Sequence, residues 1–176
     1  IATFIASPVL GVRGTFTTPG ELIFAPNGYT LEQAIREDDY GATIGLKGDA
    51  NGWRWDLSST YGQDTVRIYN NKSANNALFV DTHFSPTSFY IGLNKSTEWT
   101  SNLDISKEID AGLSAPINFA FGGEYRKNTY DIGAGDPASY YKEGAQSLPG
   151  LTPGDAGHYS RNNVAAYVDV ALQPVE

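Results

Sequence analysis

The 176-residue chain contains no cysteine and no methionine, and it has only two histidines, His83 and His158. Without cysteine, neither a disulfide-stapled mini-domain nor a cysteine-based zinc site can form. Both histidines fall in segments that the sequence pattern predicts to be long loops, where a solvated side chain is the simpler interpretation than a catalytic or zinc-binding one. We therefore expect no metal site, and we expect that the protein is not an enzyme.

Basic residues are also scarce. Twelve lysines and arginines stand against twenty acidic residues, which gives a net charge of −8. Nucleic-acid binding needs a basic patch, so a nucleic-acid partner is not expected. The run GAGDP at residues 133–137 lacks the Lys-Thr pair and the following helix of a phosphate-binding loop. No cofactor is therefore predicted.

Long apolar runs are missing as well. None approaches the roughly 20 residues that a membrane-spanning helix requires, so any membrane role would fall to strands. What the chain does have is alternation, and the longest example covers residues 89–105. Its odd positions carry Phe89, Ile91, Leu93, Lys95, Thr97, Trp99, Ser101, Leu103 and Ile105, and its even positions are almost all polar or small. A strict period of two predicts a strand with one apolar face.

Four further segments alternate in the same way, near residues 39–49, 53 to about 69, 117 to about 130, and 164–172. The first ends at Asn51-Gly52, the strongest short hairpin signal in a sequence. The first thirty or so residues contain three prolines, which predict a partial strand followed by a long loop. Together these segments predict an all-β fold with five strands in an antiparallel meander.

The predicted connections alternate in length. A tight turn at residues 51–52 is followed by a loop over 70–86, a short turn at 107–112 and a long loop over about 132–160. Short periplasmic turns and long extracellular loops are typical of outer-membrane barrels. We therefore predict that the meander forms part of a transmembrane β-barrel in a cell outer membrane.

The three tryptophans suit that interpretation. Trp53 and Trp55 lie next to the first tight turn, and Trp99 lies inside the longest strand. Aromatic rings are enriched where a barrel leaves the membrane, so we predict that all three belong to the membrane-belt aromatics. Trp53 and Trp55 could alternatively form a carbohydrate platform.

Candidate ligand-binding residues come from position alone. Glu124 and Arg126 lie on the polar side of the fourth strand, which would face the lumen of a barrel. Five more lie in the predicted long loop, where tyrosines among polar groups can stack on a sugar ring or an aromatic ligand: Asp136, Tyr140, Tyr141, His158 and Tyr159. A hydrated lumen wall and simple loop packing are the competing interpretations.

Residues 119–172 carry the segments FGGEYRKNTYDI, GDPASY, LPGLTPGDAGHYSRNN and AAYVDVAL. In these segments the chain resembles the barrel domain of TonB-dependent outer-membrane receptors. Upstream, NGWRWDLSSTYGQD, SPTSFYIG and TSNLDISKEIDAGLSAPINFAFG look like the preceding hairpins of the same receptors. The resemblance extends from about residue 26 to the end of the last strand.

The resemblance implies a Gram-negative outer-membrane barrel of about 22 strands, plugged by an N-terminal domain. Such a receptor takes up a scarce solute, such as an oligosaccharide or a siderophore, with energy delivered by the TonB complex. Its expected partners are outer-membrane lipid, the solute, and the TonB complex, which would be contacted through receptor parts that residues 1–176 lack. With about five strands and no plug, the chain is expected to be a partial receptor barrel domain.

Two alternatives remain open at the level of sequence. One is a secreted or surface β-sandwich that binds carbohydrate through its tryptophans and tyrosines. The other is a small complete outer-membrane barrel with a structural or adhesion role, which needs more strands than the alternation reveals.

Overall fold

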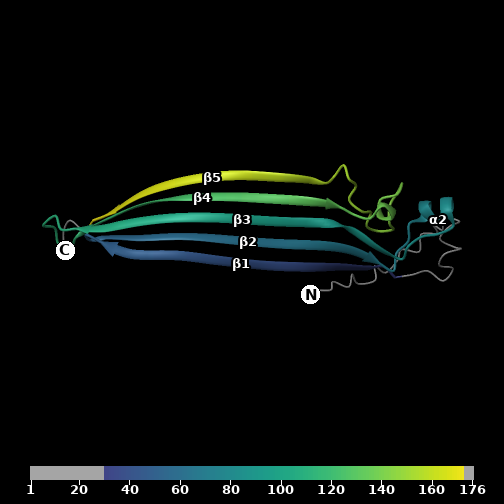
Figure 1. The fold of residues 1–176 in the computed structure, drawn as a ribbon, viewed down its shortest axis with the longest axis horizontal. Helices are drawn as coiled ribbons and strands as arrows, with labels where there is room; N and C mark the ends of the chain where they lie inside the picture. The colour runs from purple at the N-terminus through teal and green to yellow at the C-terminus, as the bar shows by residue number, and fades with distance from the viewer. Residues whose placement is uncertain (1–29, 173–176) are drawn as a thin grey trace. The chain divides into compact units, whose positions relative to one another are not determined.

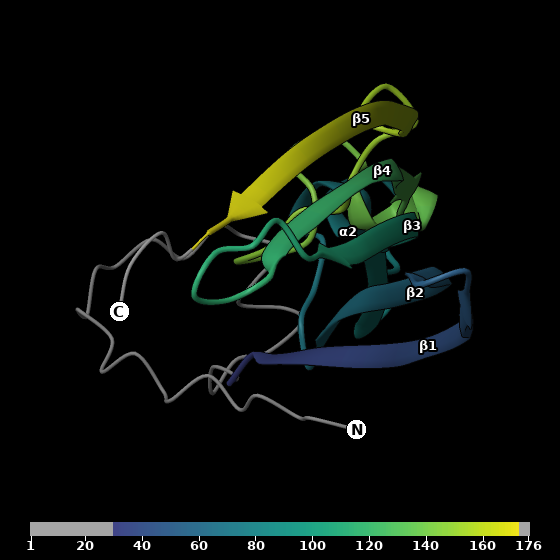
Figure 2. The ribbon, with the colours of Figure 1, turned by 90° about the vertical axis from the view of Figure 1, so that its left-hand side faces the viewer.

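The computed structural model describes residues 30–172. The partial strand and loop predicted for the first thirty or so residues lie outside the described residues. Five strands follow one another: β1 (Glu32–Ala50), β2 (Trp53–Asn71), β3 (Ser88–Ile109), β4 (Ile117–Ala134) and β5 (Gly157–Ala171). They form one open antiparallel sheet in the order β1-β2-β3-β4-β5, which can be followed in Figure 1 and, after a quarter turn, in Figure 2. The prediction of an all-β meander is confirmed.

All five strands extend beyond the residues that the alternation indicated, and β3 continues to Ile109, into the turn predicted at 107–112. The difference is largest at the start of two strands. β1 begins at Glu32, and β5 begins at Gly157. His158 and Tyr159 therefore lie in a strand, and their predicted placement in a loop is wrong. The added segments, 32–38 and 157–163, carry polar residues at both odd and even positions. Because neither segment has an apolar side, no period of two marks it as a strand.

The connections alternate in length as predicted. β1 and β2 meet at Asn51-Gly52, where both residues have the positive φ that a tight hairpin turn requires, 53° and 77°. The β3–β4 connection, residues 110–116, is also short. Residues 72–87 contain an unpredicted helix, α2 (Asn76–Thr82), and residues 135–156 contain the single 3₁₀ turn η1 (Pro137–Ser139).

The described helical segments are both short. Among residues 30–172, no helix has the length and the apolar composition that crossing a membrane would take.

The chain divides into two compact units, which are described separately. Within the described residues, unit 1 comprises 30–38, 64–95 and 130–159, and unit 2 comprises 39–63, 96–129 and 160–172. Both long connections belong to unit 1, and both short connections belong to unit 2. Loop packing is therefore confined to unit 1, whereas unit 2 consists almost entirely of strand.

Unit 1 contains the buried apolar cluster of the described chain. Phe89 and Ile91 of β3 are almost fully buried, with 1% and 3% exposure, and they pack with Ala145 of the β4–β5 connection. Three partly buried residues surround this cluster: Ile68, Ala138 and Leu148. The long β4–β5 connection thus folds back and packs against the strands by ordinary hydrophobic burial.

The alternation of β3 is interrupted at Gly92. Ile91 lines the same pocket as Ile132 of β4. Leu93 instead lies against Gly133, the residue after Ile132. A Cβ atom on Gly133 would be 3.1 Å from the Cβ of Leu93. Neighbouring residues of β4 face opposite sides, so Ile91 and Leu93 do as well. Gly92 adopts a φ of +150°, which side-chain-bearing residues rarely adopt. The prediction that Phe89 and Ile91 share one face with Leu93 and Trp99 is therefore wrong.

Side-chain contacts identify the two faces of unit 2. On one face, the hydroxyls of Thr43 and Thr60 hydrogen-bond at 3.0 Å between β1 and β2. On the other, Ser59 and Ser101 hydrogen-bond at 3.1 Å between β2 and β3, and the ring of Trp99 meets that of Tyr125 on β4. The apolar stripes predicted for β1 to β4 in this region therefore lie on one face, and the polar stripes lie on the other.

Candidate functional site

The apolar face of unit 2 is defined by the even-numbered residues of β1 and β5 and the odd-numbered residues of β2, β3 and β4. Its aliphatic side chains are exposed: Ile44 by 74%, Leu46 by 66%, Val164 by 81% and Val168 by 70%. Large contiguous exposed apolar surfaces are uncommon on water-soluble monomers and mark contact with lipid or protein. This face is therefore a candidate interaction surface of unit 2.

Two groups of aromatic rings lie on the apolar face. The first aromatic row, beside the short turns, contains Trp53, Phe119 and Phe121, with ring centroids of Trp53 6.5 and 6.1 Å from those of the two phenylalanines. The second aromatic row consists of Tyr40, Tyr61, Trp99 and Tyr125. Tyr40 meets Tyr61 at 6.2 Å, Trp99 meets Tyr125 at 6.4 Å, and the Trp99 indole donates to Ser59 Oγ at 2.7 Å.

Of the three predicted belt residues, Trp53 thus belongs to the first row and Trp99 to the second. Trp55 leans over β1, where a Cβ atom on Gly48 would lie 2.8 Å from the indole ring. On β2 and β3, the aliphatic side chains of Leu57, Leu103 and Ile105 lie between the two rows. Aromatic rings bordering an aliphatic band are the pattern found on the outer surface of membrane barrels.

Charge is distributed very unevenly between the two faces of unit 2. Within its described strands, the apolar face carries two lysines, Lys107 and Lys127, and no carboxylate. The polar face carries eight carboxylates and four cations: Asp39, Asp49, Asp56, Glu98, Asp104, Glu108, Glu124, Asp169, Lys47, Arg54, Arg126 and Arg161. One face is thus suited to an apolar environment and the other to water.

Glu124 and Arg126 lie on the polar face, as predicted, and contact each other. The Arg126 guanidinium donates to the Glu124 carboxylate at 3.0 Å and approaches Glu98 of β3 at 3.9 Å. Asn128 donates to the same Glu98 carboxylate at 2.7 Å. These side chains form a polar ladder across β3 and β4 that can exchange hydrogen bonds with water or a polar solute.

A second polar contact on this face crosses an entire strand. The Tyr167 hydroxyl on β5 donates to Asp104 Oδ1 on β3 at 2.6 Å, and its ring passes over Gly122 of β4. A pocket of about 530 Å³ lies beside this contact and is lined partly by charged residues: Lys47, Asp49, Arg54, Asp56 and Asp104.

In unit 1, the two long connections are joined by a buried asparagine. Asn75 is fully buried, and its Oδ1 accepts a hydrogen bond from Leu78 N, which caps α2. Its Nδ2 donates to the carbonyl oxygens of Ala138 and Tyr141 at 2.9 and 2.8 Å. One side chain therefore starts the helix in one loop and fixes the backbone of the other.

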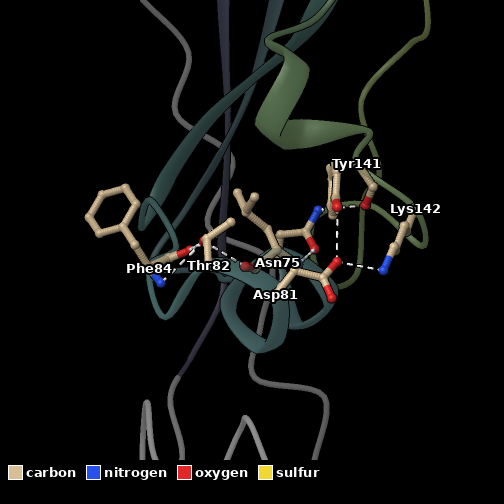
Figure 3. Close-up of polar contacts among 7 residues, drawn as sticks. Asn75, Asp81, Thr82, Phe84, Tyr141 and Lys142 are labelled. Atoms are coloured by element: carbon tan, nitrogen blue, oxygen red, sulfur yellow. Dashed lines mark hydrogen bonds and ion pairs between the residues drawn. The ribbon is translucent and has the colours of Figure 1, made fainter.

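Asp81 of α2 forms a second link to the β4–β5 connection. Figure 3 shows its carboxylate between Tyr141, which donates to Oδ2 at 2.9 Å, and Lys142, which donates to the same atom. The hydrogen bond from Lys142, and then that from Tyr141, lower the pKa of Asp81. The same carboxylate raises the pKa of both Lys142 and Tyr141. This group of three residues is called the loop latch below.

A pocket of about 780 Å³ adjoins the loop latch and is lined by α2 and residues 142–149. Its apolar wall includes Val80, which is 57% exposed, and its polar groups include Gln146. Lys142 and Ser147, in the same wall, both adopt positive φ, 49° and 74°. Backbone in this region is unusual for residues other than glycine and is often found at binding sites.

The other predicted residues of the long loop do not come together with Tyr141. Asp136 connects the loop to β3, because its carboxylate accepts from Tyr90 N at 3.1 Å. His158 hydrogen-bonds Asp131, which lies 4.0 Å from Lys95. Tyr159 lines a separate pocket of about 510 Å³ with Ile68 and Leu148. Tyr140 ends η1 and is half-buried. The seven candidates therefore occupy several places rather than one site.

Sequence reasoning missed Asn75 and Asp81 as members of these groups. Asn75 carried a usable signal, since an asparagine ahead of Ala-Leu-Phe-Val fits a helix N-cap. Asp81 carried no such signal in the sequence, because its partners are about sixty residues away in the chain.

Among residues 30–172, no three or more histidine and acidic side chains gather closely enough to hold a metal ion. Comparison with protein-family models, with curated protein sequences and with solved structures finds no match.

Proposed function

We propose that the five strands form part of the wall of a transmembrane β-barrel, and that the barrel belongs to an outer-membrane receptor that takes up a scarce solute with energy from TonB. Lipid would cover the apolar face of unit 2, and the polar face would line the solute path. The observation that carries the membrane part of the proposal is the complete segregation of carboxylates to one face of unit 2.

The spacing of the aromatic rows supports the same proposal. On β2, Trp53 of the first row and Tyr61 of the second bound a segment of nine residues, 53–61. On β4, Phe119 and Tyr125 bound a segment of seven residues. A tilted transmembrane strand needs about 9–11 residues. Between the rows, the apolar face carries only small, aliphatic or aromatic side chains.

The open sheet is consistent with a partial barrel. β1 and β5 each have one unpaired edge within the described residues, and unpaired strand edges are not tolerated in hydrocarbon. Further strands would have to join both edges. A β-sandwich would instead need a second sheet over the apolar face, and all described strands belong to one sheet.

The receptor part of the proposal rests on the resemblance of residues 119–172 to TonB-dependent receptors. The pairing of two long connections through Asn75 and Asp81 supports it, because a rigid loop surface can present a binding site to solute outside the cell. The pocket beside the loop latch falls within the size range of small-molecule sites, about 300–1,000 Å³. It is the site where solute capture is proposed.

Fractionation of the source cells tests the membrane part. An antibody against residues 135–161 should detect a band in the outer membrane, well above the 19.0 kDa of this chain. A band near 19.0 kDa in a soluble or secreted fraction would contradict the proposal and favour the carbohydrate-binding sandwich.

Gene disruption tests the receptor part. Loss of the protein should abolish growth on one nutrient at limiting concentration, and loss of TonB should have the same effect. If disruption left energy-dependent uptake of oligosaccharides, siderophores and other large solutes unchanged, the protein would be a barrel with a different role.

A further inference from the structure

A cation with no carboxylate partner lies beside the first aromatic row. Lys107 Nζ lies 5.1 Å from the centre of the Trp53 ring, and the lysine side chain passes within 3.8 Å of the position that a Cβ atom on Gly52 would take. Lys107 is half-buried by these contacts. In the described part of the chain it makes no ion pair, because every carboxylate of the unit 2 strands is on the polar face.

A second donor lies in the same place. Within residues 30–172, the Trp53 indole N–H has no hydrogen-bond acceptor, in contrast with the indole of Trp99, which donates to Ser59. The Trp53 ring is held edge-on to Phe119 and Phe121, both with interplanar angles of 77°. The Lys107 ammonium and the Trp53 N–H thus lie together next to the apolar rings of Phe119 and Phe121.

We propose that Trp53 and Lys107, with Phe119 and Phe121 below them, form a binding site for the phosphate of an anionic phospholipid. The ammonium and the indole N–H donate to phosphate oxygens, and the acyl chains lie on the aliphatic surface between the aromatic rows. This inference rests on the proposed membrane location of the apolar face. It goes further, because it assigns one headgroup chemistry to one position on that face.

The chemistry of the position selects an anion. A zwitterionic headgroup brings its own cation close to Lys107, and the apolar face offers no carboxylate to accept it. An anionic headgroup such as phosphatidylglycerol brings a phosphate and hydroxyl groups only, and charge-assisted hydrogen bonds to phosphate are the strong ones. The ring face of Trp53 also holds the ammonium in place before the lipid arrives.

Lys127 provides a matched control on the same face. It follows Tyr125 of the second aromatic row, it is exposed, and in the described chain it has no ring contact. Replacing it by glutamine removes the same charge without touching the Trp53 site. General attraction of lipid to positive charge would respond equally to both substitutions.

The test uses the full-length protein in nanodiscs made of equal parts phosphatidylglycerol and phosphatidylcholine. After transfer to detergent, native mass spectrometry counts the lipids that remain bound. Wild type should retain phosphatidylglycerol in preference to phosphatidylcholine. Lys107→Gln and Trp53→Phe should each reduce the retained phosphatidylglycerol at least threefold, whereas Lys127→Gln should leave it unchanged.

Equal retention of the two lipids by wild type, or equal losses in Lys107→Gln and Lys127→Gln, would overturn the site. Flotation of the nanodisc preparations separates this outcome from failure of the membrane proposal. A protein that floats with lipid but shows no preference contradicts only the phosphate site. A protein that does not associate with lipid contradicts both.

Discussion

The hydroxyl of Tyr167 donates to Asp104 across an intervening strand, and the tyrosine ring takes the space where Gly122 has no side chain. A Cβ atom on Gly122 would lie 2.6 Å from both Leu103 O and Tyr167 Cε1. The contact therefore joins β3, β4 and β5 on the polar face of unit 2, and it depends on the absence of one methyl group.

Gly122→Ala should consequently destabilise the protein by about 1–3 kcal/mol, the usual range for overpacking. Gly62→Ala is the control, because a Cβ atom at Gly62 meets nothing within 4 Å, and we expect it to be neutral or to stabilise by up to about 1 kcal/mol. Urea unfolding in detergent, followed by tryptophan fluorescence, measures both. Equal effects of the two substitutions would show that Tyr167 does not lie over Gly122.

Asn75 should be the residue on which the two long connections depend most. Asn75→Ala removes the helix cap and leaves buried carbonyl groups unpaired, so we expect a loss of about 1–3 kcal/mol. Asn75→Asp keeps an acceptor for Leu78 N but cannot donate to Ala138 and Tyr141. Both variants should make residues 135–156 more sensitive to protease on intact cells. If Asn75→Asp behaved like wild type, the asparagine would serve only as a helix cap.

The loop latch should open at both extremes of pH. The lowered pKa of Asp81 means that its contribution is present above its ordinary pKa and is lost as the pH falls through the lowered value, below about pH 4. The raised pKa values of Lys142 and Tyr141 mean that their contributions are lost as the pH rises through those values, above about pH 10.

Because the chain has no cysteine, spin labels at Val80→Cys and Ser147→Cys can report this opening by pulsed electron paramagnetic resonance. The interlabel distance should be constant from about pH 4 to 10 and broaden outside that range. Asp81→Asn should broaden it throughout, with no further acid transition. An interlabel distance that changed neither with pH nor in the Asp81→Asn variant would contradict the latch.

Leu103 and Asn102 should differ strongly in their sensitivity to the same substitution. Leu103 lies on the apolar face between the aromatic rows, and Asn102 is its neighbour on the polar face. In a bilayer, Leu103→Arg should destabilise the fold by about 2–4 kcal/mol, the figure for arginine on the lipid face at mid-membrane. Asn102→Arg should change stability by less than about 1 kcal/mol. Unfolding in lipid vesicles gives both values, and similar losses at the two positions would contradict the assignment of faces.

The sequence predicted the parts of the fold in which a strand has one apolar and one polar side. Residues 53–61 and 99–107 alternate so strictly that their faces could be assigned before the structure, and the contacts of Ser59 with Ser101 and of Trp99 with Tyr125 agree. Residues 157–163 are polar on both sides, so their strand could not be distinguished from a loop. At Gly92 the sequence pattern was misleading instead of absent. One residue of positive φ places Phe89 and Ile91 on the other face, although the alternation of apolar residues in the sequence continues through it.

The candidate site was less predictable for a different reason. Glu124 and Arg126 are two residues apart on one strand, so local alternation was enough to place them together. Asp81 and Tyr141 come from separate loops, and only the folding of both loops onto the ends of β2, β3 and β4 brings them together. Such contacts leave no periodic signal in a single sequence.

The central claim, that lipid covers one face of unit 2, is tested most directly by single cysteines at neighbouring positions. Leu57→Cys and Leu103→Cys place a thiol on the apolar face, and Ser58→Cys and Asn102→Cys place one on the polar face. In outer-membrane vesicles, a water-soluble maleimide should label positions 58 and 102 and leave 57 and 103 unreacted, because a thiol in hydrocarbon stays protonated and out of reach of the reagent. After the vesicles are dissolved and the protein is unfolded, all four thiols should react. Equal labelling of all four thiols in the intact vesicles would contradict the account.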